Sequence, residues 1–297
     1  MTVAAVAASV DTPPEAPQQD AAVARPRRRA RGLLGLPWGL YLAIAVVSLA
    51  VLWALIPGVF APGDPLTGTP ADKLLPPSAA HPFGTDTLGR DLFGRVVHGA
   101  VHSLSGALIA VTVGLALGTI LGAVAGAIGG VVDDILMRVV DVLLAIPGLL
   151  LSLSVIILLG FGTVNAAIAV GLGSVAAFAR LMRSEVARVR RSEYVEAAYG
   201  SGGTFFTVLR RHVLPNSLTP IVALAALQFG TAILAISTLG FLGYGAPPPT
   251  PEWGLLIAEG RNYIATAWWL TALPGLVVVV VVLSANRISH RIGRNPR

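Results

Sequence analysis

The sequence predicts an all-α integral membrane protein with six transmembrane helices. Of its 297 residues, 55% are hydrophobic and 12% are charged, and the mean hydropathy is +0.76. A soluble domain carries about 25% charged residues, so this chain has too little polar surface to cover a globule in water. The sequence contains no cysteine, which excludes disulfides, thiolate metal sites and cysteine nucleophiles. Lipid is therefore the expected solvent for most of the chain.

Windows without Asp, Glu, Lys or Arg locate the transmembrane segments. These windows cover residues 32–63, 96–132, 142–179, 212–251 and 262–286. Each is long enough to supply the roughly 20 apolar residues that cross a bilayer. The window 142–179 is too long for one helix, and the turn-like cluster at 160–165 divides it. The predicted spans are 38–57, 104–129, 138–160, 164–183, 217–240 and 266–286.

The basic residues in the connections set the orientation, because Arg and Lys are retained on the cytoplasmic side. If the N-terminus is inside, 17 of the 21 basic residues lie in cytoplasmic segments and four in outer segments. Both termini are therefore predicted to be cytoplasmic, in a multi-pass plasma-membrane protein surrounded by the lipid bilayer. Topology accounts for the net charge of +6, so we expect no nucleic-acid partner.

The spans divide the chain into regions. Residues 1–32 are rich in Ala, Pro and Arg, and they are predicted to form a disordered basic cytoplasmic tail. Residues 33–103 hold the first transmembrane helix and an outer loop. Residues 104–286 form a five-helix transmembrane core that includes a cytoplasmic loop at 184–215. Residues 287–297 form a second basic cytoplasmic tail.

The predicted spans carry little chemistry of their own. None has a carboxylate at its middle, where proton-driven carriers usually place one, so the energy for uphill transport is expected to come from another polypeptide. No nucleophile–base pair appears, and the segment Gly84–Asp91 lacks the Lys-Ser/Thr of a P-loop. His81, His98 and His102 match no zinc-ligand spacing. We expect no enzyme activity and no catalytic residue, metal site or cofactor on this chain.

Two local patterns predict how the helices pack. Glycines at four-residue spacing share one face of the second span, which predicts close helix contact. These glycines are Gly114, Gly118, Gly122, Gly126 and Gly130. Arg138 is spaced to pair along one helix with Asp134 at i,i+4 and with Asp141 at i,i+3.

The longest cytoplasmic connection, 184–215, has more apolar residues than a bare linker needs. Good helix formers without proline predict a helix from Ser184 to Tyr199. The glycines at 200, 202 and 203 then predict a sharp turn. A second short helix is expected from Thr204 to Arg211, ending before Leu214-Pro215. The apolar side chains of this loop need a partner, which is either the bilayer surface or a cytosolic protein.

The second half of this loop resembles a family motif. Glu196-Ala197-Ala198, Gly202 and, after nine intervening residues, His212-Val213-Leu214-Pro215 are similar to the EAA loop of ABC-importer permeases. His212 departs from the general pattern, which has Ile at that position. In this family the loop is a coupling helix that docks in a groove on the ATPase subunit. The resemblance therefore implies ATPase-coupling roles for Glu196, Ala197, Ala198, Gly202, Leu214 and Pro215.

Two outer segments resemble the C-type permease of dipeptide and oligopeptide importers. The first is an outer-loop signature that contains His81, Phe83, Gly84, Asp86, Gly89, Arg90 and Asp91. The second follows the fifth span, from Gly240 to Trp269. The resemblance covers about residues 35 to 286, and the basic stretch from Asn286 to Arg291 departs from the usual ending of the branch.

The resemblance implies a type I ABC-importer permease fold and a set of partners. These partners are a second, dissimilar permease, two cytosolic ATPase subunits that bind ATP and Mg²⁺, and an extracytoplasmic peptide-binding protein. The chain would form half of the translocation pathway for di- or oligopeptides. Two alternatives stay open: a nickel-importer permease, which shares much of the signature, and a membrane anchor that recruits a cytosolic protein without transporting a solute.

Overall fold

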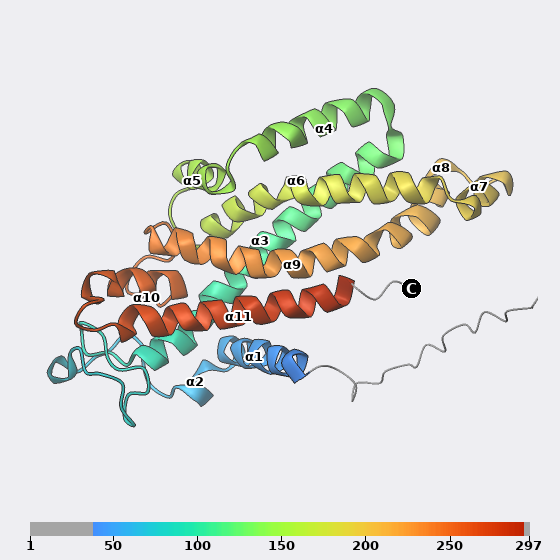
Figure 1. Cartoon of the computed structure of the whole chain (residues 1–297). Helices are drawn as coiled ribbons and strands as arrows, with labels where there is room; N and C mark the ends of the chain where they lie inside the picture. The colour runs from blue at the N-terminus through green and yellow to red at the C-terminus, as the bar shows by residue number, and fades with distance from the viewer. Residues whose placement is uncertain (1–37, 294–297) are drawn as a thin grey trace, which may run out of the picture. The chain divides into compact units, whose positions relative to one another are not determined.

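The computed structural model describes residues 38–293, and every regular element within that range is helical. The predicted tail 1–32 and the last residues of the tail 287–297 lie outside the described residues. Along the chain the elements are α1 Trp38–Leu55, α2 Pro57–Phe60, η2 Pro70–Asp72, α3 Leu92–Ile128, α4 Gly130–Ala145, α5 Gly148–Leu159, α6 Thr163–Arg190, α7 Glu193–Gly200, α8 Phe205–Val208, η3 Leu209–Val213, α9 Leu214–Phe241, α10 Trp253–Gly260, η4 Arg261–Tyr263 and α11 Trp269–Gly293 (Figure 1).

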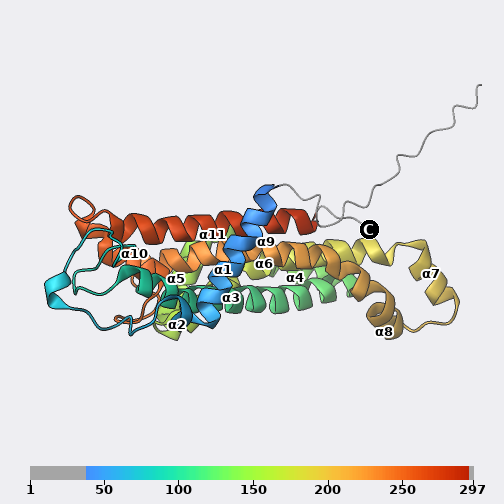
Figure 2. The same cartoon turned by 90° about the horizontal axis from the view of Figure 1, so that it is seen from below.

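Five helical segments of the described chain are long and apolar enough to cross a membrane, and the bent pair α4–α5 makes a sixth if it counts as one span. The long helices are α1, α3, α6, α9, which is extended by α8 and η3, and α11. Figures 1 and 2 place α10 and the loop before α3 at one end of this bundle and α7 and α8 at the other. The candidate sites therefore lie at opposite ends of the same helices.

The predicted span 138–160 is wrong as a single helix. The structure has two helices there, α4 and α5, whose axes differ by 96°. Pro147 causes the break, because it lacks an N–H and disfavours helical geometry in the residue before it. Ile146 is accordingly extended, with φ −86° and ψ 126°. The other predicted break, at 160–165, is confirmed: α5 ends at Leu159, and the Asn165 side chain donates to the Leu159 carbonyl oxygen over 3.0 Å.

The glycine face of α3 packs directly on α6, as the spacing predicts. A Cβ atom at Gly118 would lie 2.5 Å from the Val175 carbonyl oxygen, and one at Gly122 would lie 2.3 Å from that of Ala179. Gly130 is an exception to the predicted face, because it starts α4 with φ +56° and has no neighbour within 4 Å. The close contact therefore runs from Gly114 to Gly126.

The predicted ion pairs along one helix are replaced by pairs between helices. Asp141 of α4 accepts from Arg180 of α6 over 2.6 Å, and Asp133 pairs with Arg183 of α6. A pair at i,i+3 or i,i+4 contributes only a few tenths of a kcal/mol, so a partner on the neighbouring helix competes easily. These pairs tie the outlying helix α4 to the bundle.

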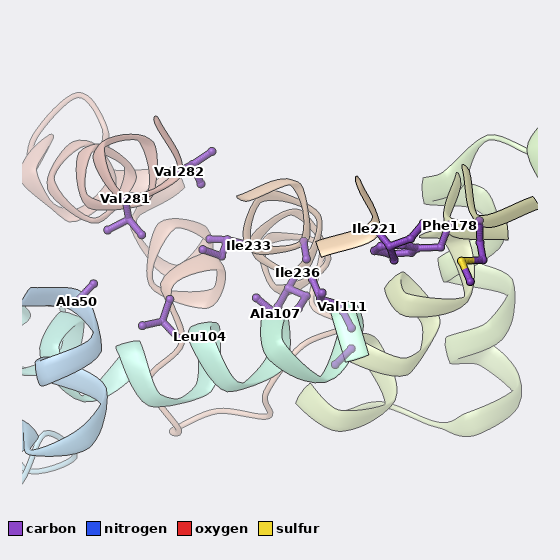
Figure 3. Close-up of a cluster of buried hydrophobic side chains, with 14 of the residues drawn as sticks. Ala50, Leu104, Ala107, Val111, Phe178, Ile221, Ile233, Ile236, Val281 and Val282 are labelled. Atoms are coloured by element: carbon purple, nitrogen blue, oxygen red, sulfur yellow. The ribbon is translucent and has the colours of Figure 1, made fainter. Parts of the chain in front are cut away.

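The central apolar core joins α3, α6, α9, α11 and α1 (Figure 3). Its buried side chains include Ala50, Leu104, Ala107, Val111, Phe178, Ile221, Ile233, Ile236, Val281 and Val282. Leu104, Ala107 and Val111 recur at three- and four-residue intervals, so they share the face of α3 that meets α9. The core is therefore continuous from the α10 end towards the α7–α8 end.

Candidate functional site

The predicted helix from Ser184 to Tyr199 is interrupted. Helix α6 continues to Arg190, and α7 starts at Glu193 after a short turn. Ser192 stands at the N-cap position with extended geometry, φ −84° and ψ 145°. Serine is favoured at such positions, and here its hydroxyl donates to the Val189 carbonyl oxygen and makes no capping bond to α7. Ser192-Glu193 was thus the sequence signal for a new helix start. The break turns α7 away from the axis of α6 (Figure 2).

Gly202 follows α7 in the left-handed conformation, which glycine adopts readily because it has no Cβ atom. Its φ is +85°, its N–H donates to the Tyr199 carbonyl oxygen over 2.9 Å, and the Gly203 N–H donates to that of Ala198 over 3.0 Å. This is the Schellman arrangement, which satisfies the last carbonyl groups of a helix. The turn residue predicted from the EAA-like motif is thus needed for its backbone conformation, since nothing lies within 4 Å of the position of its missing Cβ.

The loop that contains α7 and α8 exposes apolar and aromatic side chains. Val195 and Val208 are buried and anchor the loop in the central core. In contrast, Phe206 is 79% exposed and Tyr194 is 47% exposed. Glu196 and Ala197 are exposed on α7. An exposed aromatic cluster beside a charged group is typical of a protein-binding surface.

The expected end of the second short helix before Leu214-Pro215 is wrong. Helix α8 passes through a π-helical turn, η3, directly into α9. Pro215 follows the π-helical turn directly, after the Leu214 N–H has donated to the Leu209 carbonyl oxygen five residues earlier, so the proline that lacks an N–H stands where the hydrogen-bond pattern changes. The Asn216 side chain donates to the His212 carbonyl oxygen over 2.6 Å. Leu214 and Pro215 thus begin a long helix instead of ending a loop.

At the opposite end of the bundle, the outer-loop signature surrounds a buried ion cluster. The Asp86 carboxylate accepts from the Arg90 Nε over 2.6 Å and from the Arg95 Nη1 over 2.9 Å. Arg95 is completely buried, and its Nη1 also donates to Glu259 of α10 over 2.6 Å. Buried charges are tolerated only when they are paired in this way. The cluster joins the loop, the first turn of α3 and α10.

The remaining signature residues shape the loop around that cluster. Asp91 caps α3 by accepting from the Gly94 N–H over 2.7 Å, and it also contacts His81 Nδ1 at 3.1 Å. Gly84 and Gly89 have φ of +74° and +75°. A Cβ atom at Gly89 would collide with the Thr69 carbonyl group. Phe83 stacks edge-on against Phe93 of α3 at 5.3 Å. The structure thus brings all seven signature residues together.

Glu252 is a second buried acid near this end. Its side chain is fully buried between the end of α9 and the start of α10, and it accepts from the Ala246 N–H over 2.9 Å. Burial raises the pKa of Glu252 to about 7, because the charged form loses hydration. The next residue, Trp253, donates its indole N–H to the Val96 carbonyl oxygen of α3 over 2.9 Å. Glu252 therefore lies at the junction of α3, α9 and α10.

A cavity of about 240 Å³ lies between α3, α5, α6 and α9. Its polar lining comes from Ser152, Ser174, Gln228 and Thr231. Gln228 stands at the middle of α9, and the lining residue Ala110 stands at the middle of α3. Helix α5 begins at this cavity, and no side chain caps its first N–H groups. The cavity is thus a mainly apolar recess with four polar side chains, which lies near the middle of α3 and α9.

A comparison with protein families identifies the chain. The family model described as "Binding-protein-dependent transport system inner membrane component" matches residues 118–297. The chain belongs to this family. Its members are membrane subunits of ABC transporters that work with ATPase and substrate-binding partners, and they are not enzymes. This permease is accordingly a multi-pass protein of the plasma membrane.

Individual relatives of this permease agree with the assignment. It is 38% identical to the dipeptide transport system permease protein DppC of Alkalihalophilus pseudofirmus, over 82% of each chain. It is 36% identical to the probable D,D-dipeptide transport system permease protein DdpC of Escherichia coli, over 86% of this chain and 85% of the relative. The glutathione transport system permease protein GsiD of Shigella flexneri is 44% identical over 71% of this chain and 69% of the relative.

Solved structures show the same fold at low sequence identity. A chain of the MetNI methionine ABC transporter, in an inward-facing conformation, matches with a TM-score of 0.54 and 19% identity, over 68% of this chain and 98% of that chain. A chain of an amino acid ABC transporter matches with a TM-score of 0.53 and 14% identity, over 68% and 94%. The ABC-importer permease fold predicted from the sequence is therefore confirmed.

The ion cluster gives a stability prediction. Asp86→Ala is expected to lower the free energy of unfolding by about 3 kcal/mol, because it removes a carboxylate partner from the buried Arg95. Arg188→Ala, which removes an exposed pair with Glu185, is the matched control and is expected to cost less than about 1 kcal/mol. Unfolding of the purified chain in detergent micelles measures both values. Equal losses would contradict a structural role for the cluster.

The raised pKa of Glu252 gives a pH prediction. An acid whose pKa rises from 4.5 to about 7 on folding binds more protons in the folded state between these pH values. Stability should therefore fall as the pH rises from about 4.5 to about 7, by at most about 3 kcal/mol. Glu252→Gln should remove that dependence and be the more stable form at pH 8. A pH series of unfolding experiments checks this, and parallel curves for the two proteins would refute it.

Proposed function

We propose that this chain is the permease subunit of an ABC importer for di- or oligopeptides and that the α7–α8 loop couples it to cytosolic ATPase subunits. The observation that carries the proposal is the exposed loop itself, which is anchored by Val195 and Val208 and turns at Gly202 between α7 and α8. The names of the relatives described above refer to dipeptide, D,D-dipeptide and glutathione transport. These names support a peptide substrate over the nickel alternative.

The coupling roles fall on the residues of the EAA-like motif. Glu196 offers a charge to basic groups of an ATPase, and the small side chains of Ala197 and Ala198 allow close approach. Phe206 adds a large exposed ring of the kind that anchors protein interfaces. ATP and Mg²⁺ would bind to the ATPase subunits. The excess of basic residues in the segments at this end supports a cytoplasmic position for the loop.

Two further partners complete the proposed importer. A second, dissimilar permease would supply the other half of the pathway, and the exposed apolar side chains of α4 and α5 offer it a surface. Among them Leu158 is 85% exposed and Val131 is 72% exposed. An extracytoplasmic peptide-binding protein would dock at the α10 end, near the outer-loop signature. The lipid bilayer surrounds the rest.

The cavity between α3, α5, α6 and α9, which we call the mid-length cavity, supports a translocation pathway that passes between these helices. A peptide crossing the membrane must exchange its hydrogen bonds with water for bonds to the protein. The Gln228 amide can both donate and accept, and the uncapped N–H groups at the start of α5 can meet a carboxylate. We therefore place the peptide backbone against Gln228, Thr231 and the first turn of α5.

A backbone test addresses coupling. Gly202→Pro is expected to abolish ATP-dependent dipeptide uptake, because proline cannot adopt φ +85° and lacks the N–H that bonds Tyr199. Gly200→Ala is the matched control, since Gly200 has no neighbour within 4 Å and no positive φ. Uptake of a labelled dipeptide is measured in a deletion strain with equal amounts of inserted protein. Normal uptake in Gly202→Pro would remove the assigned role of the turn.

The same assay separates the competing functions. Loss of nickel uptake with unchanged peptide uptake on deletion would move the chain to the nickel branch. If neither changed while loop variants lost a cytosolic partner, the membrane-anchor alternative would hold.

A second test addresses the pathway. Gln228→Leu is expected to reduce dipeptide uptake about tenfold. The change removes a cavity side chain whose hydrogen bond to the peptide would contribute about 1.5 kcal/mol. Thr238→Val is the matched control: Thr238 is exposed on α9, outside the cavity lining, and bonds only its own helix. ATP hydrolysis of the assembled transporter should persist in both variants. Equal uptake by the two variants would place the pathway elsewhere.

A further inference from the structure

The contact between α1 and α11 contains two cavities that no step of the proposed transport uses. The first, of about 510 Å³, is lined by Gly39, Leu42, Ala43, Leu283, Ser284, Asn286, Arg287 and His290. The second, of about 200 Å³, is lined by Val46, Leu49, Ala50, Trp53, Leu276, Val277, Val280 and Val281. Both lie between the same two helices, so we call the pair the α1–α11 seam.

The two cavities follow each other along the seam. On α1 the lining passes from Gly39 and Ala43 to Ala50 and Trp53 at intervals of three and four residues, which keep to one helix face. On α11 it passes in the opposite direction, from His290 to Leu276. From Gly39 to Trp53 the seam is about 21 Å long at 1.5 Å per residue. This exceeds half of the hydrocarbon thickness of about 30 Å.

One end of the seam is cationic and the rest is apolar. The Arg287 guanidinium lines the cavity at that end beside Ser284, Asn286 and His290, while every side chain that lines the second cavity is Ala, Val, Leu or Trp. Neither α1 nor α11 contains an Asp or Glu. None of the ion pairs within residues 38–293 includes Arg287. The cationic end therefore lacks an anionic partner within the described chain.

Gly39 gives the Arg287 guanidinium its place at the mouth of the seam. A Cβ atom at Gly39 would lie 2.5 Å from the Arg287 Nη2, so any larger residue would push the guanidinium out. At the far end, the Trp53 ring meets Phe93 edge-on at 5.9 Å and closes the apolar part.

We infer that the α1–α11 seam binds one anionic phospholipid, with its phosphate on Arg287 and one acyl chain along the apolar lining towards Trp53. The two cavities, one lined by the Arg287 guanidinium and one wholly apolar, match the charge of the head group and the apolar acyl chain of such a lipid. Basic pockets between membrane helices are known to select anionic head groups. A zwitterionic lipid would bring its own cation to a mouth that holds no carboxylate. The site is independent of the proposed peptide pathway, which lies between other helices.

The test uses the full-length chain, purified from membranes with the subunits that remain bound to it. Native mass spectrometry counts the phosphatidylglycerol retained after exchange into detergent, with phosphatidylcholine as the neutral probe. We expect the wild type to retain one phosphatidylglycerol. Arg287→Gln should retain about fivefold less of this lipid, and Arg287→Lys should retain it fully. Arg138→Gln is the matched control, because Arg138 is an exposed arginine of α4 away from the seam, and it should behave as the wild type.

A phosphatidylglycerol with a photoreactive acyl chain then locates the site. Cross-links are expected on α1 and α11 at the lining residues, and Leu42→Trp, which fills the first cavity, should reduce them. Leu52→Trp, on a part of α1 outside both cavities, should leave them unchanged. Equal retention of the two lipids, or of phosphatidylglycerol by Arg287→Gln and Arg138→Gln, would overturn the inference. Cross-links elsewhere would also overturn it, and cross-links from a bound subunit would assign the seam to that subunit.

Discussion

Four glycines on one face of α3 bring its backbone against the backbone of α6, and the other helices are arranged around this contact. At Gly118 and Gly122 even a methyl group would meet a carbonyl oxygen of α6 at 2.5 Å or less. In a bilayer there is no hydrophobic force between helices, so such close van der Waals contact supplies much of the attraction. The two helices are therefore expected to move as one body.

That body connects the two candidate sites. Helix α3 begins at the ion cluster of Asp86, Arg95 and Glu259, and α6 leads directly into the α7 loop. The mid-length cavity borders both helices, together with α5 and α9. A displacement of the loop by a docked protein would thus act on the walls of the cavity through packed helices. This arrangement fits transport by rigid-body motion, driven from outside the chain.

Much of the fold could be predicted from the sequence, because charge-free windows report directly on burial in lipid. The close α3–α6 contact followed from glycine spacing, and the turn at 160–165 followed from composition. The break at Pro147 was missed, because hydropathy measures polarity and not the direction of the chain. Ser192 was missed because a cap signal is weak beside a run of good helix formers. The role of Arg95 could not be predicted, since its partner Glu259 is 164 residues away in sequence.

The length of α3 has a consequence for where its charges lie. The cavity residue Ala110 stands at the middle of the helix, and Arg95 stands fifteen residues before it, or about 22 Å along the axis. Half of the hydrocarbon layer measures only about 15 Å. If the cavity lies at the bilayer midplane and α3 is upright, Arg95 is about 7 Å beyond the acyl chains, at the level of the lipid head groups. The length of this 37-residue helix thus places the buried Arg95 guanidinium outside the hydrocarbon layer.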